Sequence, residues 1–276
     1  MSASTDQYGY LPSTPPALFA IVYFGIAVIA IVTQTIFGKY THYWMFTLAL
    51  TPAGEAIGWG ARYWAHSNPV DWMPYVIQLC SLIVCPVFLS ATNYILFCKI
   101  AEKTGPKLFL IPNRIYWILF VILDIISLTI QTIGGVMTSN AENFADLDYG
   151  SNVMLNGIIF QFSCTVFFVV LVAGMIFRSR AKGITLVSVT GWPIMITLWL
   201  SAVMILIRNG YRIAELHDGW KGHWIRTEWY LIAFDMAPMA VAVAAYIVIS
   251  PSHCLSNDKK VEEHKRARLS DCIPLC

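Results

Sequence analysis

Charged residues are scarce in this chain. Of its 276 residues, 12% are charged and 57% are hydrophobic, whereas ordinary soluble domains carry roughly 25% charged residues. Water cannot be the main solvent of such a sequence, so the composition excludes an ordinary soluble domain. We also expect no nucleic-acid partner.

Lysine and arginine are absent from the first fifteen residues. A cleavable signal peptide begins with a basic segment ahead of its apolar run. We therefore expect the apolar run that begins near Ala17 to remain in the protein as a membrane helix.

Further absences exclude classes of chemistry. No cysteine lies in a predicted outer loop, so we expect no disulfide framework. All six histidines fall in predicted loops or in the tail, which argues against a zinc-dependent membrane hydrolase. All nine lysines lie outside the predicted helix cores, which excludes a retinal Schiff base, and a Gly-x-x-x-x-Gly-Lys-Ser/Thr loop for ATP is missing. The sequence thus predicts no metal and no cofactor, and it indicates no catalytic residue.

The sequence contains long runs of apolar residues. Seven runs approach the ~20 residues that cross a bilayer as a helix, and they are continuous rather than alternating as in a β-barrel. We predict an all-α, polytopic membrane protein with a bundle of seven transmembrane helices. These span residues of about 16–37, 45–65, 74–98, 115–137, 153–177, 190–212 and 229–249.

Basic residues are divided unequally between the two sets of connections. Thirteen of the 18 Lys and Arg residues fall in one set, which includes the C-terminal tail. Because basic residues near helix ends stay in the cytoplasm, we predict the N-terminus outside and the C-terminus inside. We predict an outer arm over residues 1–15, a membrane domain over 16–252, a disordered basic tail over 253–276 and an acidic outer loop over 138–152. The predicted location is the plasma membrane, with internal membranes as the alternative.

Ionisable residues inside the predicted helices are the candidate functional residues, since a charge at membrane depth costs about 3 kcal/mol. Glu55 and Arg62 are seven residues apart and share a helical face, and Asp124 and Gln131 repeat that spacing. The complete set of candidate binding residues is Glu55, Arg62, Asp124, Gln131, Arg208, Arg212, Glu215, Glu228 and Asp235.

These charges allow two interpretations. They can form a structural ion-pair network that fixes the packing of the helices, or they can line a ligand pocket in the outer half of the membrane. We favour the pocket, because a packing network rarely needs so many charges in one layer. If the charged faces of these helices converge, the carboxylates of Glu55, Asp124 and Asp235 would pair with Arg62, Arg208 and Arg212, and this pairing would greatly reduce the cost of burying them.

Five segments also carry a family resemblance. They are Tyr8 to Ser13, Glu55 to Arg62, Asp124 to Gly135, Arg208 to Glu215 and Glu228 to Pro238. In this order on the predicted helices, they resemble the fungal lipid-translocating exporter family named for resistance to aminocholesterol. The resemblance implies seven helices and the export or flipping of amphiphiles, with sphingoid long-chain bases as the best-known substrates. One member of that family is associated with porphyrin and haem traffic.

Three functional hypotheses follow. The first is binding and translocation of an amphiphilic lipid, so the expected partners are membrane lipids and an amphiphilic small molecule. The acidic groups would suit a ligand with an ammonium head, and the arginines would suit a phosphate or carboxylate head. The second is a lipid-sensing, receptor-like protein. The third is an intramembrane enzyme in which Glu55 or Asp124 donates a proton to a lipid or isoprenoid, and porphyrin or haem transport is a minor alternative. The sequence specifies neither the oligomeric state nor the energy source.

Overall fold

The structure, a computed structural model, is a bundle of long helices. It describes residues 13–37, 44–67, 71–104, 113–139, 143–181, 191–218 and 227–251. The predicted tail and most of the predicted N-terminal arm lie outside these residues. The elements are α1 (Thr14–Phe37), α2 (Met45–Ser67), α3 (Trp72–Thr104), α4 (Asn113–Ser139), α5 (Phe144–Ala181), α6 (Gly191–His217), α8 (Glu228–Leu231), the π-helix η1 (Ile232–Met236) and α9 (Ala237–Val248).

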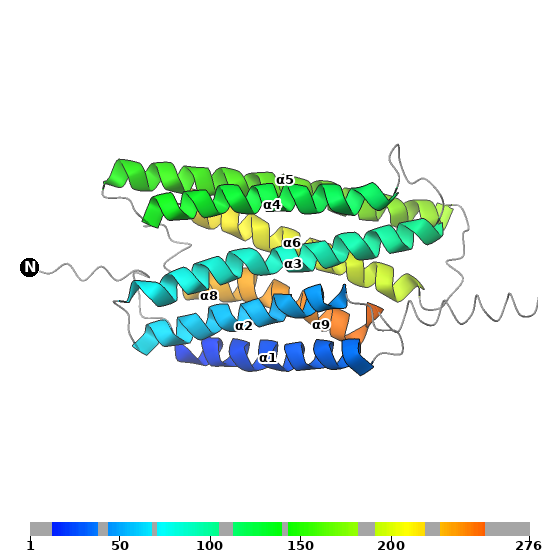
Figure 1. Cartoon of the computed structure of the whole chain (residues 1–276), viewed down its shortest axis with the longest axis horizontal. Coiled ribbons are helices and arrows are strands. Elements are labelled where there is room, and N and C mark those ends of the chain that lie inside the picture. The colour runs from blue at the N-terminus through cyan, green and yellow to red at the C-terminus, as the bar shows by residue number, and fades with distance from the viewer. Residues whose placement is uncertain are drawn as a thin grey trace, which may run out of the picture.

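The helices run in roughly the same direction, along the long axis of the molecule (Figure 1). Helix α1 lies at one edge of the bundle, α4 and α5 lie at the other, and α3 and α6 lie between them (Figure 1). Helix α2 packs against α1 and α3, while α6 packs against α5 and α9. Residues far apart in the sequence therefore meet along the inner faces of α2, α3, α6 and α9.

Six of the described helices are long and apolar enough to cross a membrane: α1, α3, α4, α5, α6 and the continuous α8–η1–α9 helix. Many of their large apolar side chains point outward, among them Ile29, Val170 and Phe177. Exposed apolar surface on this scale needs a lipid environment rather than water. The chain is therefore a polytopic helical membrane protein.

Helix α2 is not among the six. At 23 residues it is long enough to cross a bilayer, but Glu55 and Arg62 lower its hydropathy. Both side chains are buried, at 0% and 1% exposure. The polar face of α2 is thus turned into the bundle.

Several predicted helix ends were wrong. Helix α5 begins at Phe144 instead of residue 153, so Asp146 and Asp148 belong to its first turns and not to a loop. Helix α3 continues to Thr104 and contains Lys99, which we had expected in a connection. The reason is physical: a helix of 38 residues is about 57 Å long at 1.5 Å per residue. Hydropathy detects only the apolar part of such a helix.

Two glycines bring α2 close to α3. A Cβ atom on Gly54 would collide with the Sγ of Cys85, and one on Gly58 would lie 3.1 Å from the side chain of Leu82. Small residues four apart let two membrane helices approach closely. The Ser81 hydroxyl uses this closeness to donate to the Gly54 carbonyl at 2.6 Å. Glu55, which follows Gly54, is thereby placed at the helix interface.

Candidate functional site

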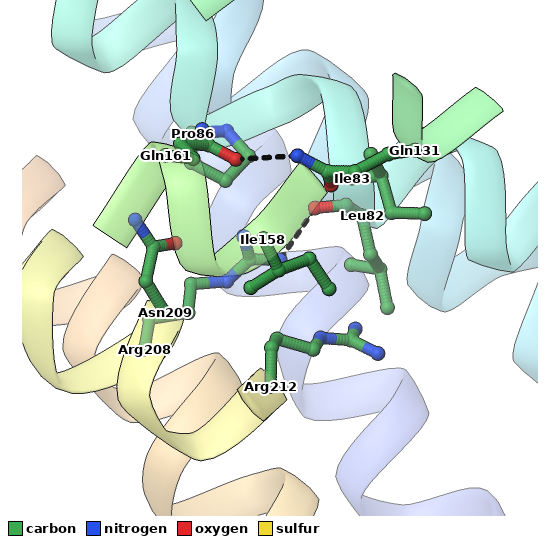
Figure 2. A pocket seen from close by; sticks show the side chains of 9 residues that line it. All are labelled: Leu82, Ile83, Pro86, Gln131, Ile158, Gln161, Arg208, Asn209 and Arg212. Atoms are coloured by element: carbon green, nitrogen blue, oxygen red, sulfur yellow. Dashed lines mark hydrogen bonds between the residues drawn. The ribbon is translucent and has the colours of Figure 1, made fainter. Parts of the chain in front are cut away.

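Arg208 of α6 is anchored by a carbonyl that a proline leaves free. In an α-helix the N–H of residue 86 would bond the carbonyl of residue 82, but Pro86 has no N–H. The Leu82 carbonyl instead accepts a hydrogen bond from the Arg208 Nη2 at 2.5 Å, as Figure 2 shows. A proline in α3 thus creates an acceptor for a buried arginine of α6.

Arg208 belongs to a largely buried group of ionisable side chains that we call the central charge cluster. Its Nε lies 2.7 Å from Asp235 Oδ1, and its Nη2 lies 3.8 Å from Glu55 Oε1. Arg212 joins the same group, with Nη2 at 3.1 Å from Asp235 Oδ2 and Nη1 at 2.9 Å from Glu215 Oε2. The cluster therefore comprises Glu55, Arg208, Arg212, Glu215 and Asp235, drawn from α2, α6 and η1.

The cluster holds more acid than base. Three carboxyl groups face two guanidinium groups. Glu55 has the weakest pairing in the cluster. It is fully buried, and the guanidinium nitrogen of Arg208 lies 3.8 Å away. Neither of its carboxylate oxygens has a hydrogen-bond partner among the described residues. A buried acceptor without a partner is costly. Glu55 is therefore the member of the cluster best suited to receive a further proton donor or cation.

A wide helical turn holds Asp235. Residues Ile232–Met236 form a π-helix in which the Ala237 N–H bonds the Ile232 carbonyl five residues back. Pro238 follows at once and lacks the N–H that would bond the Phe234 carbonyl. Wide turns of this kind often occur at functional sites. Asp235, at 1% exposure, thus reaches two arginines of α6 from an irregular segment.

Arg62 and Glu228 form a separate pair near one end of the bundle. Arg62 Nη2 donates to Glu228 Oε1 at 2.7 Å. Ser13, just before α1, donates to the same carboxylate from its backbone N–H at 3.1 Å and from its hydroxyl at 2.6 Å. The pair therefore joins the first turn of α8 to α2 and to the start of α1.

Asp124 lies apart from these arginines, so the charged face of α4 does not converge with those of α2 and α6. Its Oδ2 accepts a hydrogen bond from the Tyr94 hydroxyl at 3.0 Å, and the structure gives it no ion pair with any described residue. Tyr94 is itself enclosed by the rings of Phe120 and Phe168, at centroid distances of 4.9 and 4.8 Å. Helix α4 turns the face that carries Asp124 and Gln131 toward α3 and α5. The polar faces of α4 and α2 share a seven-residue spacing, but they do not meet.

Gln131 connects α4 to α5 through a short polar chain. Its Nε2 lies 2.8 Å from both the Ser127 hydroxyl and Gln161 Oε1. Gln161 was not among the predicted site residues. Nor was Asn209 of α6, which donates a hydrogen bond to the Thr165 hydroxyl at 3.4 Å. These polar residues stand alone in apolar helices, and that isolation was the signal that could have identified them.

A small cavity lies between the polar chain and the central charge cluster. Its volume is about 20 Å³, room for one water molecule and no more. Figure 2 shows Gln131 bonded to Gln161 on one side and Arg208 on another. The lining comprises Leu82, Ile83, Pro86, Gln131, Ile158, Gln161, Arg208, Asn209 and Arg212. The structure thus joins five of the nine predicted site residues in the central charge cluster. Gln131 lies across this cavity from them. Arg62 and Glu228 pair with each other, and Asp124 bonds Tyr94.

Comparison with known proteins identifies relatives over most of the chain. The chain is 26% identical over 281 aligned positions to the sphingoid long-chain base transporter RSB1 of Saccharomyces cerevisiae, covering 88% of this chain and 72% of the relative. It is 32% identical to protein RTA1 of the same yeast, and the alignment covers 71% of this chain and 62% of that protein. It is 29% identical to protein RTM1, also of Saccharomyces cerevisiae, and that alignment covers 70% of this chain and 63% of that protein. No solved structure gives a significant match. Because the sequence profile of the RTA1-like proteins matches residues 48–258, the chain belongs to the RTA1-like protein family.

Proposed function

We propose that this protein binds an amphiphile with a cationic head at the central charge cluster and moves it across the bilayer. The observation that carries the proposal is Glu55, a fully buried carboxyl in a cluster of three acids and two bases. Within the part of the chain that the structure describes, its oxygens have no hydrogen-bond partner. An ammonium head has three N–H donors and no acceptor. It would satisfy the free oxygens of Glu55 and balance the charge of the cluster.

The same geometry disfavours an anionic head. Arg208 already faces Asp235 and Glu55, and Arg212 already faces Asp235 and Glu215. A phosphate or carboxylate would have to displace Asp235 and would then lie beside three carboxyl groups. The relative RSB1 is named for sphingoid long-chain bases, which are amines, and this chemistry agrees with the cluster.

Translocation requires the helices to separate, because the cavity beside Arg208 has room for a single water molecule. Helices bend most readily at prolines and at π turns. Pro86 in α3 and the segment from η1 to Pro238 flank the cluster. We propose that these two segments move when the head enters, and that Asp124 and Gln131 form a second polar station between α3, α4 and α5.

Binding should follow the charge of the head. We expect the purified protein to bind a sphingoid long-chain base at least tenfold more tightly than the same molecule with its amine acylated, since losing hydrogen bonds to a charged group costs about 1.5–3 kcal/mol. Titration of each compound against the protein in mild detergent measures this difference. Equal affinities would show that the head is not recognised by its charge.

We further propose that α2 also crosses the membrane, which makes seven spans, with the N-terminus outside and the basic tail in the cytoplasm. Because the tail carries five Lys and Arg residues between positions 259 and 268, it should stay inside. A tag after Cys276 should react with antibody only in permeabilised cells, and a tag before Tyr8 should react on intact cells. This test presumes the plasma membrane, our proposed location. Equal access to both tags would contradict an odd number of spans.

A further inference from the structure

A second, larger cavity lies between the end of α3 and the start of α4. Its volume is about 300 Å³, and it is lined by Ile95, Cys98, Lys99, Glu102 and Trp117. This is about ten times the share of one water molecule in the liquid and the lower end of the range for small-molecule sites. We call it the α3–α4 groove. It lies at the end of the bundle opposite to Arg62 and Glu228, since α2 and α3 run antiparallel to one another (Figure 1).

The groove carries both signs of charge on one helical face. Lys99 and Glu102 are three residues apart on α3 and therefore lie side by side. The ammonium of Lys99 also lies 5.0 Å from the centre of the Trp44 ring, a contact that fixes the position of the long side chain. The groove thus presents a positioned cation next to an exposed carboxylate.

The remaining walls are apolar. Ile95 lines the side of α3, and Trp117 lines the side of α4 with 38% of its surface exposed. Tryptophan is typical of the depth at which lipid heads meet the acyl chains. The volume suffices for a polar head but not for an acyl chain, so the chain of any bound amphiphile would remain in the bilayer beside α4.

We propose that the α3–α4 groove binds the head of an amphiphile that carries one phosphate and one amine. Lys99 would hold the phosphate and Glu102 the amine, while Ile95 and Trp117 would cover the carbon atoms next to the head. A head with an amine alone would meet the Lys99 ammonium, and a head with a phosphate alone would leave Glu102 beside an anion. Two sources have this chemistry: an aminophospholipid of the bilayer and a phosphorylated long-chain amine. The inference does not depend on the proposed function of the central charge cluster.

The test uses the full chain in mild detergent and measures the concentration of each lipid that gives half of its maximal thermal stabilisation. The probes are phosphatidylethanolamine, a phosphorylated sphingoid base, phosphatidylglycerol as a phosphate without an amine, and an unphosphorylated sphingoid base. We expect at least one of the two amino-phosphates to bind about tenfold more tightly than phosphatidylglycerol. Comparing phosphatidylethanolamine with the phosphorylated sphingoid base then shows whether the groove prefers a two-chain phospholipid or a single-chain phosphorylated amine.

Variants of the groove separate its two charges. Glu102→Gln should weaken amino-phosphate binding about tenfold and leave phosphatidylglycerol unchanged or tighter, whereas Lys99→Gln should weaken every phosphate. Ile95→Trp should fill the groove and remove the preference. Ile122→Trp is the matched control, because Ile122 is 48% exposed and lies on a different face of α4 from Trp117.

Two results would overturn the proposal: no preference of the wild type for either amino-phosphate over phosphatidylglycerol, or the same preference in Glu102→Gln and Ile95→Trp as in the wild type. The unphosphorylated base serves a different purpose. Its binding should not change in Glu102→Gln, so a failure at the central charge cluster and a failure at the groove give different results.

Discussion

Replacing Arg208 with methionine is expected to unfold the protein or to prevent its accumulation. The substitution removes the partner of Asp235 at 2.7 Å, the nearest guanidinium to Glu55, and the donor to the Leu82 carbonyl. Breaking a buried ion pair by removing one partner costs about 3–5 kcal/mol. That loss is a large part of the total stability of a typical domain.

Arg178→Met is the control for this substitution. Arg178 is exposed near the end of α5, where replacing a charge changes stability little. Expression level and thermal stability of both variants in the same detergent provide the comparison. An Arg208→Met protein as stable as Arg178→Met would mean that the contacts of Arg208 do not hold α6 to α2, α3 and η1.

Replacing Gly134 with alanine should separate α4 from α5. A Cβ atom at this position would lie 2.5 Å from the backbone nitrogen of Met154 and 2.8 Å from the carbonyl oxygen of Gly150. Backbone atoms cannot rotate away as a side chain can, so the two helices must move apart. We expect a loss at or above the upper end of the 1–3 kcal/mol typical of overpacking.

Gly135→Ala provides a control one residue away. A Cβ atom on Gly135 would meet no side chain and no neighbouring helix of the described residues within 4 Å. Alanine is also favoured over glycine in a helix by about 1 kcal/mol. The two adjacent substitutions should therefore change thermal stability in opposite directions. A Gly134→Ala protein with unchanged stability would contradict the close contact between α4 and α5.

The sequence predicted much of this architecture, because apolar length and helical periodicity are local properties. Helical spacing correctly placed Arg208, Arg212 and Glu215 on one face of α6, and all three belong to the central charge cluster. The resemblance to the fungal exporter family was confirmed by the match over residues 48–258. The predicted start of α5 was wrong because the first turns of this helix are polar and lie outside the apolar run.

The choice of partners could not be predicted from the sequence. Arg62 pairs with Glu228, 166 residues away, and not with Glu55 on its own helix. Asp124 repeats the spacing of Glu55 yet faces Tyr94, because the rotation of α4 about its axis depends on its packing against α5. The role of Pro86 in freeing an acceptor for Arg208 likewise depends on which helix lies opposite. Helical periodicity predicts which residues share one face of a helix. Which helix and which side chains that face contacts depends on the packing of the bundle.

Glu55→Gln tests the proposed binding of a cationic head most directly. The amide keeps the shape of the side chain and removes its charge, while Arg208 retains Asp235 as its counter-charge at 2.7 Å. We therefore expect the variant to fold with nearly unchanged thermal stability and to bind a sphingoid long-chain base at least tenfold more weakly than the wild type. Glu102→Gln, which removes an exposed carboxylate at the other site, is the matched control and should bind the base normally. A folded Glu55→Gln protein with wild-type affinity for the base would contradict the account.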